Sequence, residues 1–202
     1  MVEVMRILLA SANTHKRTEI ARMLKNEEIL LPSDLKIPFL CDETGSTFIE
    51  NAMLKADTLF RQAPQGTIVM ADDSGLCVDA LGGRPGIHSA RYGMTNGKEL
   101  EAEKRNSLLL SEMLPFPEWE ERTAHFVCAL VVRFDSNRLF VFQEAVDGHI
   151  MEKPSGTAGF GYDPIFFIDQ AGCGMAELPE GEKDTFSHRG RAIRDFIKEM
   201  RQ

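Results

Sequence analysis

The first half of the chain alternates short apolar runs with segments of helical periodicity. Arg6 to Ala10 is an apolar run of strand type that ends in a polar turn. From His15 onward, apolar residues recur at helical spacing. Thr47 and Glu50 have the spacing of a capping box, which predicts a second helix that ends near Pro64. The chain is therefore expected to open as strand, polar turn, helix, and then a further helix.

The centre of the chain carries further strand patterns. Thr67 to Ala71 is β-branched and apolar, which predicts a buried strand leading directly into a turn at Asp72-Asp73-Ser74-Gly75. Asn96 to Leu114 has helical periodicity. Thr123 to Phe134 and Arg138 to Val146 predict two strands joined by a short polar turn.

The last quarter of the chain combines a long loop with one helix. The loop runs from Glu152 to Pro164, and Ser187 is expected to cap the final helix. We predict an α/β fold with a mixed, elongated and twisted sheet flanked by helices. No shift in composition marks a linker. Residues 1–202 are therefore expected to form one domain of two lobes that share elements, with the active-site cleft between them.

Composition narrows the class of protein. The net charge of -8 argues against a nucleic-acid binder, and no apolar run reaches the roughly 20 residues of a membrane span. Met1 to Arg6 does not have the pattern of a signal peptide. The four cysteines form no CxxC pair, as expected of buried thiols in a reducing compartment. These features predict a cytoplasmic protein that contacts neither nucleic acid nor a membrane.

The first candidate for chemistry is the turn Ser11-Ala12-Asn13-Thr14-His15-Lys16. A polar turn between a strand and a helix presents backbone N–H groups at the positive end of the helix dipole, which suits a phosphate. Lys16 would add a full positive charge. The alternative is a capping turn with a solvated lysine, because the turn is neither a Walker A loop nor GxGxxG.

The second candidate is the pair Asp72-Asp73. Adjacent carboxylates repel each other, so their position suggests a cation, and Mg²⁺ binds to one or two carboxylates together with phosphates and waters. The alternative is an Asx-type turn that only ends the strand. Asp42-Glu43 is a second acidic pair, which matters only if the fold brings it near Asp73. Lys55 lies beside an apolar stripe, where a lysine either reaches solvent or binds phosphate.

Two further candidates lie near the C-terminus. In Gly159-Phe160-Gly161-Tyr162-Asp163-Pro164, two aromatic residues between glycines could stack on a base, or could form a turn with buried rings. Lys183 and Ser187-His188-Arg189 bring basic residues to the start of the last helix, where they oppose the dipole. An arginine pairs well with the 6-keto oxygen and N7 of a purine. The alternative is a set of solvated charges.

The order of these blocks along the chain is distinctive. It resembles that of the inosine triphosphate pyrophosphatase family, also called Ham1-like or RdgB-like pyrophosphatases. The resemblance runs from Arg6 to the last helix. It rests on the following motifs: Ser-Ala-Asn-x-x-Lys, Glu-Thr-Gly-x-Thr-Phe-x-Glu-Asn-Ala-x-x-Lys-Ala, Ala-Asp-Asp-Ser-Gly-Leu-x-Val-Asp-Ala-Leu-x-Gly-x-Pro-Gly, Ser-Ala-Arg-Tyr, Gly-Phe-Gly-Tyr-Asp-Pro and Ser-His-Arg-Gly-x-Ala.

The resemblance implies Mg²⁺-dependent hydrolysis of ITP, dITP and XTP to the monophosphate and pyrophosphate, which removes these nucleotides before their misincorporation into DNA and RNA. It also implies a homodimer. Asp73 matches the position of a catalytic proton acceptor and metal ligand, and Glu43 that of a second metal ligand. The matched positions for substrate binding are Ser11, Ala12, Asn13, Thr14, His15, Lys16, Lys55, Ser74, Phe160, Gly161, Tyr162, Asp163, Lys183, His188 and Arg189.

Two residues depart from the family pattern. The family usually has glycine at Ala12 and often at Ala158, so a positive φ at either position would strain alanine. Three other functions remain open on sequence alone: a pyrophosphatase for other modified nucleotides, a nucleotide-binding module without turnover, and an oligomerisation domain. The division of ligand and base roles between Asp72 and Asp73 also remains open.

Overall fold

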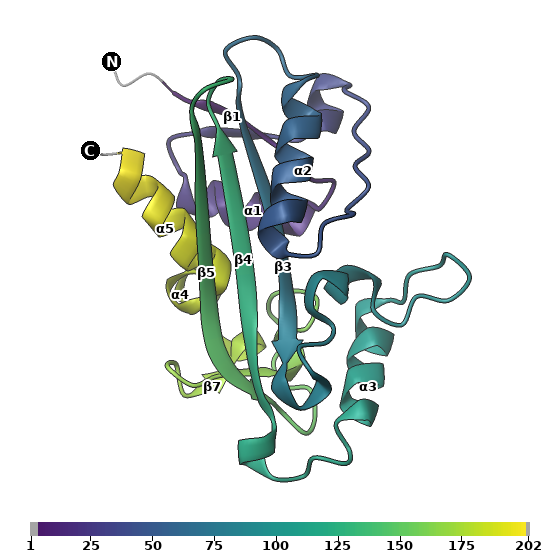
Figure 1. Cartoon of the computed structure of the whole chain (residues 1–202). Coiled ribbons are helices and arrows are strands. Elements are labelled where there is room, and N and C mark those ends of the chain that lie inside the picture. The colour runs from purple at the N-terminus through teal and green to yellow at the C-terminus, as the bar shows by residue number, and fades with distance from the viewer. Residues whose placement is uncertain (1–3, 201–202) are drawn as a thin grey trace. The chain divides into compact units, whose positions relative to one another are not determined.

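The computed structural model describes residues 4–200 (Figure 1). Residues 1–3, part of the N-terminal segment expected not to be a signal peptide, and residues 201–202 lie outside the described residues. No helix within residues 4–200 is long and apolar enough to cross a membrane.

The strands form one mixed seven-stranded sheet in the order β2-β1-β3-β4-β5-β6-β7. β1 is parallel to β2 and β3, whereas β6 is antiparallel to β5 and β7. The expected α/β class is confirmed. The strands are β1 (Arg6–Leu9), β2 (Glu28–Leu30), β3 (Ile68–Val78), β4 (Thr123–Arg133), β5 (Leu139–Ile150), β6 (Phe166–Ile168) and β7 (Cys173–Gly174). The helices are α1 (Thr14–Met23), α2 (Phe48–Phe60), α3 (Ala102–Glu112), α4 (Glu180–Phe186) and α5 (His188–Met200).

The chain divides into two compact units, each made of separate segments. The first unit comprises Met1–Asp73, Cys128–Glu144 and Arg189–Gln202. The second unit comprises Ser74–Val127 and Ala145–His188. The long strands β3, β4 and β5 each contribute residues to both units.

The first unit has a hydrophobic cluster on each face of its strands. Alternate strand residues such as Leu9 and Met70 pack with Ile20 of α1 and Phe196 of α5. The intervening strand residues, such as Val69, pack with α2. Successive side chains of a strand point to opposite faces, which explains this division. Figure 1 shows α2 and α5 beside the strands that they cover.

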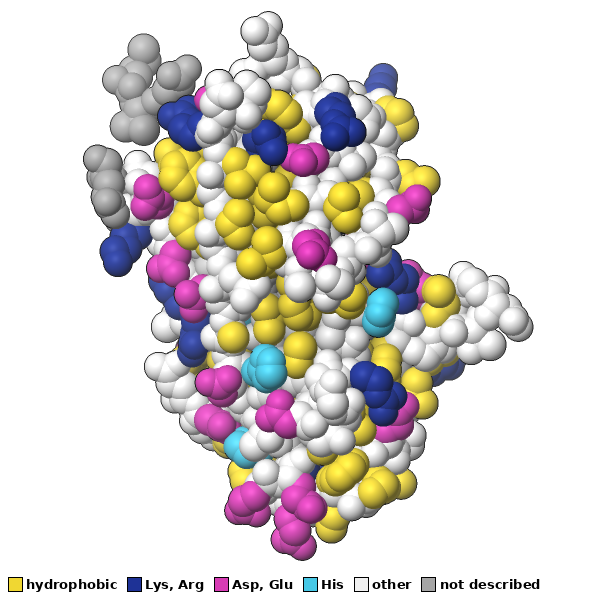
Figure 2. Space-filling model, viewed as in Figure 1, with side chains coloured by type: hydrophobic (Ala, Val, Ile, Leu, Met, Phe, Trp, Pro, Cys, Tyr) yellow, Lys and Arg dark blue, Asp and Glu magenta, His cyan; other side chains and the backbone are white. Residues whose placement is uncertain are grey.

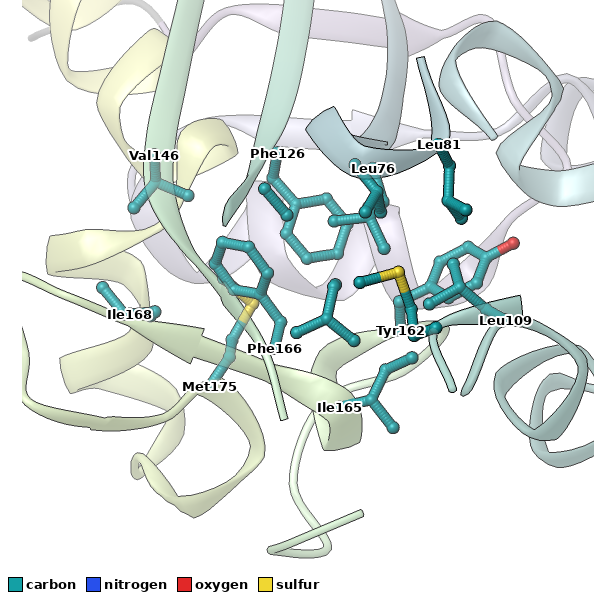
Figure 3. Close-up of a cluster of buried hydrophobic side chains, with 14 of the residues drawn as sticks. Leu76, Leu81, Leu109, Phe126, Val146, Tyr162, Ile165, Phe166, Ile168 and Met175 are labelled. Atoms are coloured by element: carbon teal, nitrogen blue, oxygen red, sulfur yellow. The ribbon is translucent and has the colours of Figure 1, made fainter. Parts of the chain in front are cut away.

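The core of the second unit is one continuous cluster (Figure 3). Phe166 of β6 contacts Phe126 of β4 edge to face, with ring centroids 4.8 Å apart. Leu109 and Met113 from the α3 segment are fully buried in the same cluster. The core therefore joins segments that are far apart in the sequence.

The predicted turn at Asp72-Asp73-Ser74-Gly75 is wrong. These residues lie inside β3, which continues to Val78. Leu76 and Val78 are fully buried and extend the apolar pattern beyond the aspartates. The two carboxylates are accommodated within the strand because both have buried cationic partners, described below.

Several element boundaries also differ from the prediction. The helix expected from Asn96 begins at Ala102, because Asn96 and Gly97 both have positive φ and form a turn. Thr47 caps α2 by accepting the Glu50 N–H at 3.1 Å, as predicted. Glu50 does not complete the reciprocal bond of the capping box, since its carboxylate accepts the Ser46 N–H at 2.6 Å.

Candidate active site

The alternation of β3 sends Asp72 and Asp73 to opposite faces of the strand. Asp72 shares a face with Met70, which belongs to the cluster under α1 and α5. Asp73 shares a face with Ala71, which belongs to the cluster under α2. Two adjacent carboxylates therefore meet different sets of side chains, all within the first unit.

Asp72 lies in a saturated charge network. Lys16 Nζ donates to Oδ1 at 2.5 Å, and Arg189 Nε donates to Oδ2 at 2.7 Å. The Cys128 thiol lies 3.4 Å from the same Oδ2. Arg189 Nη1 also donates to Glu19 at 2.6 Å. Both oxygens of Asp72 thus have donors from the protein.

The charges of this network are almost completely buried. Asp72 is 1% exposed and Arg189 is 3% exposed. Burial opposes the charge of Asp72, but Arg189 and Lys16 outweigh it and hold the pKa of this carboxyl well below its usual range. Burial likewise opposes the charge of Arg189, but Asp72 and Glu19 raise its pKa. The positive charge that opposes the α5 dipole is therefore balanced by two carboxylates.

Asp73 lies in an incomplete network. Lys55 Nζ donates to Asp73 Oδ1 at 2.6 Å and to Glu43 Oε1 at 3.1 Å. The other oxygen, Asp73 Oδ2, is buried and has no hydrogen-bond partner among the described residues. A buried polar atom of this kind costs free energy unless a ligand satisfies it.

The two partners of this pair respond to burial differently. Burial raises the pKa of the Asp73 carboxyl, and Lys55 offsets only part of that effect. Burial opposes the charge of Lys55, but Asp73 and Glu43 outweigh it and raise its pKa, so Lys55 is an ammonium. Lys55 is therefore buried rather than solvated, and its ammonium bridges two carboxylates. The prediction that it contacts the substrate stays a prediction.

The loop that carries Glu43 is held by Asn51 of α2. Asn51 is fully buried, and its Oδ1 accepts the Gly45 N–H at 2.8 Å. A Cβ on Gly45 would lie 2.7 Å from Glu50 Cβ and 2.8 Å from Asn51 Oδ1. Glycine at position 45 thus lets the loop lie close to α2, which brings Glu43 within reach of Lys55.

The phosphate candidate Ser11 to Lys16 forms the N-terminus of α1. Asn13 is the N-cap, and its Oδ1 accepts the N–H groups of His15 at 2.9 Å and Lys16 at 3.2 Å. Among non-glycine residues of the described chain, only Lys36 and Asn96 have positive φ. Alanine at positions 12 and 158 is therefore free of the strain that a positive φ would impose.

In the second unit, Asp163 organises the block between the glycines. Asp163 Oδ2 accepts the Phe160 N–H at 2.7 Å and Lys183 Nζ at 2.6 Å. Lys183 Nζ also lies 5.1 Å from the centroid of the Phe160 ring. A Cβ on Gly159 would lie 2.1 Å from Asp163 Oδ2, so glycine is required at this turn.

The two aromatic residues of this block have different surroundings. Tyr162 is 4% exposed and belongs to the core, and its hydroxyl donates to the Ser89 carbonyl at 2.9 Å. Phe160 is half-buried. Asn106 of α3 donates to the Gly161 carbonyl at 3.0 Å and supports the turn. Of these two aromatic residues, Phe160 is therefore the better candidate for stacking on a base.

The remaining predicted residues lie at three further points. His188 is buried in the second unit, stacked on Phe126 with centroids 4.8 Å apart. Arg189 belongs to the first unit and binds Asp72 and Glu19 rather than remaining solvated. Ser74 lies on β3 with its side chain half-buried. The prediction that these three residues contact substrate stays a prediction.

The structure brings several predicted site residues into contact and shows supporting residues that were not predicted. It places Lys16 on Asp72, and Lys55 between Asp73 and Glu43. Sequence reasoning did not single out four supporting residues: Glu19, Asn51, Asn106 and Cys128. Glu19 could have been found from the sequence, because it follows Lys16 by three residues and so lies on the same face of the predicted helix. The other three act through contacts that connect distant segments.

The donor set suits a hard cation. Glu43 and Asp73 offer carboxylate oxygens. One of these oxygens, Asp73 Oδ2, is buried and has no hydrogen-bond partner among the described residues. The part of the chain that the structure describes contains no group of three or more His, Cys, Asp or Glu side chains able to hold a metal. Mg²⁺ needs only one or two carboxylates when phosphate oxygens and waters complete its shell. These residues fit Mg²⁺ bound together with a phosphate ligand.

Paired lysines and carboxylates at a strand, with a helix N-terminus beside them, define an α/β protein suited to phosphate chemistry. The sequence matches the model of the Ham1 family over residues 7–199. The chain belongs to the Ham1 family.

Relatives and solved structures agree with this assignment. The chain is 49% identical over 199 residues to a dITP/XTP pyrophosphatase of Treponema denticola, covering 96% of this chain and 99% of the relative. It is 44% identical to the dITP/XTP pyrophosphatase of Geobacillus kaustophilus, covering 93% and 90%. A Ham1 protein from Coxiella burnetii superposes with a TM-score of 0.84 at 34% identity, covering 98% of each chain.

Proposed function

We propose that this protein hydrolyses ITP, dITP and XTP to the monophosphate and pyrophosphate, cleansing the nucleotide pool before misincorporation occurs. The proposal is carried by the buried Asp73. Lys55 joins one of its oxygens to Glu43, and its other oxygen has no hydrogen-bond partner among the described residues. It is supported by relatives named dITP/XTP pyrophosphatase that match nearly the whole chain.

The triphosphate would bind to the first unit at Ser11 to Lys16 and at Lys55. The cations Lys16, Lys55 and Arg189 are already balanced by the carboxylates of Glu19, Glu43, Asp72 and Asp73. The paired groups therefore carry no surplus positive charge for a polyanion. Mg²⁺ held by Asp73 and Glu43 would neutralise phosphate charge and could lower the pKa of a bound water.

In the proposed reaction, water attacks the α-phosphorus and pyrophosphate leaves. Asp73 would orient the water and accept its proton through Oδ2, the oxygen that Lys55 does not bind. Asp72 suits this role less well, because both of its oxygens have donors and Arg189 and Lys16 hold its pKa well below the usual range. Lys16 and Lys55 would stabilise negative charge on the phosphates.

The nucleoside would bind to residues of the second unit. The Phe160 ring would stack on the base, and Lys183, held by Asp163, would place a buried donor beside it. A donor that faces the 6-keto oxygen of hypoxanthine would meet the amino group of adenine instead, leaving buried groups unpaired. This arrangement would favour deaminated purines over ATP.

Other parts of the proposal rest on the resemblance and stay predictions: Mg²⁺ as the cofactor, the homodimer, and the cytoplasmic location. On the face drawn in Figure 2, Lys and Arg side chains stand singly among acidic and hydrophobic ones. Together with the net charge of -8, this agrees with a small-molecule substrate rather than a nucleic acid.

The test is pyrophosphate release from ITP, dITP, XTP, GTP and ATP, with and without Mg²⁺. We expect high kcat/KM for the first three substrates and low kcat/KM for ATP, with full dependence on Mg²⁺. Equal activity on ATP and ITP would refute the selectivity. Tight binding of ITP without pyrophosphate release would favour a binding module.

A further inference from the structure

We propose that Lys55 has a second role: it occupies the two metal-binding carboxylates in the nucleotide-free enzyme, so that the metal binds only together with the triphosphate. This inference rests on the proposed function, because it takes Asp73 and Glu43 as the metal ligands. It concerns the order of binding, which the proposed reaction leaves undetermined.

The position of the Lys55 ammonium carries the proposal. Lys55 Nζ lies 2.6 Å from Asp73 Oδ1 and 3.1 Å from Glu43 Oε1, so it bridges the carboxylates that the metal would need. The side chains of Lys55 and Asp73 are each only 9% exposed. An ammonium in this position offsets half of the negative charge of the pair and repels a second cation at short range.

A free metal ion has little to offset that repulsion. Only two carboxylates are available, and the described residues contain no cluster of three or more potential metal ligands. Mg²⁺ gives up its waters reluctantly and relies on phosphate oxygens to complete its shell. The nucleotide-free site is therefore expected to bind metal weakly.

A triphosphate changes the balance by offering Lys55 a different anion. The flexible stem of lysine lets Nζ turn from Asp73 and Glu43 to a phosphate oxygen. The two carboxylates are then released to the metal, which binds the same phosphates. Metal and nucleotide thus bind cooperatively, and linkage requires each to tighten the other by the same factor.

The experiment measures Mn²⁺ binding to nucleotide-free protein by electron paramagnetic resonance of unbound Mn²⁺. Wild type is compared with Lys55→Met and Lys55→Gln, and with Lys16→Met as the matched control. Lys16 is also paired with an aspartate of β3, but it does not contact Asp73 or Glu43. We expect the Lys55 variants to bind Mn²⁺ at least about tenfold more tightly than wild type, and Lys16→Met to show a much smaller gain.

A second measurement repeats the titration with the non-hydrolysable α,β-methylene analogue of ITP. The analogue should tighten Mn²⁺ binding to wild type by about tenfold or more and have much less effect on Lys55→Met. Circular dichroism confirms that each variant is folded, and Lys55→Gln serves if Lys55→Met is not. Unchanged Mn²⁺ affinity in the Lys55 variants, or an equal gain in Lys16→Met, overturns the proposal. Failure of the proposed function would appear separately, as a lack of pyrophosphate release by wild type.

Discussion

The charge networks around Asp72 and Asp73 differ in one respect, which is whether the protein completes them. Asp72 has donors from Lys16 and Arg189 on its two oxygens, and its side chain is fully buried. Asp73 has one donor, Lys55, and its Oδ2 is unpartnered among the described residues. The protein's own donors complete the first network, whereas the second leaves one buried oxygen for which the described residues supply no donor.

The difference follows from the alternation of one strand. Adjacent residues of β3 face opposite helical layers, so a shift of a single position changes the set of side chains that surrounds a carboxylate. Lys16 and Arg189 approach Asp72 from α1 and α5. Lys55 approaches Asp73 from α2. The comparison teaches that a tandem acidic pair in a strand need not act as one site.

The largest expected effect is on catalysis in Asp73→Asn. The substitution removes the carboxylate charge of the incomplete network, and pyrophosphate release from ITP should fall by about 10³-fold. A coupled assay with saturating Mg²⁺ measures kcat and KM. If Asp73→Asn keeps more than about a tenth of wild-type kcat/KM, Asp73 does not have the catalytic role proposed for it.

The next effect is on stability in Asp72→Asn. Removing this carboxylate leaves Lys16 without its aspartate and Arg189 with Glu19 alone in a buried site, which should lower the free energy of unfolding by about 3–5 kcal/mol. Urea denaturation monitored by circular dichroism measures the change. Asp73→Asn is the control and should lose clearly less, because Lys55 keeps Glu43 as a partner. Equal losses in both variants would show that the two networks do not differ.

The pH dependence of stability should have opposite signs for the two aspartates. The pKa of folded Asp72 is lowered, so its stabilisation is complete above the ordinary pKa and is lost as the pH falls through the folded value. The pKa of folded Asp73 is raised, so its ionisation costs stability as the pH rises from the ordinary pKa through the folded one.

Urea denaturation of wild type and both variants, from about pH 3 to pH 7, measures these differences. The advantage of wild type over Asp72→Asn should be constant above about pH 5 and shrink only below about pH 4. The advantage over Asp73→Asn should instead decline as the pH rises above about pH 4. The same trend for both variants would contradict the difference between the two networks.

The sequence predicted the fold class and several main elements, since their signals are local. The strand at Arg6, the cap at Thr47 and the paired strands after Thr123 all follow from periodicity and turn chemistry. The prediction of a turn at Asp72-Asp73 was wrong, because two consecutive charged residues are typical of the end of a strand. Only the tertiary fold, which brings Lys16, Lys55 and Arg189 to them, keeps these charges within a strand.

The candidate site was predictable only in part, for the same reason. Its members lie on β3, two helices and a loop, so their pairings depend on long-range contacts. Motif order predicted Asp73, Glu43 and Lys55 as site residues, but no local pattern indicates that Lys55 bridges the other two. Likewise, no local pattern indicates the buried partners of Asp72, whose role the sequence leaves open.

The smallest expected effect is on stability in Glu19→Gln. This variant tests whether the ion pairs around Asp72 are strong because they are buried. Glu19→Gln keeps the shape of the side chain but removes the charge that Arg189 Nη1 contacts at 2.6 Å. The free energy of unfolding should fall by about 1–3 kcal/mol, because Arg189 retains Asp72 as a partner. The matched control is Glu28→Gln, which breaks an ion pair of the same 2.6 Å length with Arg6, whose side chains are 65% and 45% exposed. Water screens that pair, so its loss should lower the free energy of unfolding clearly less than Glu19→Gln does. Urea denaturation measures both losses. If they are equal, burial does not strengthen the Arg189–Glu19 ion pair, and the argument that buried pairs stabilise the network around Asp72 fails.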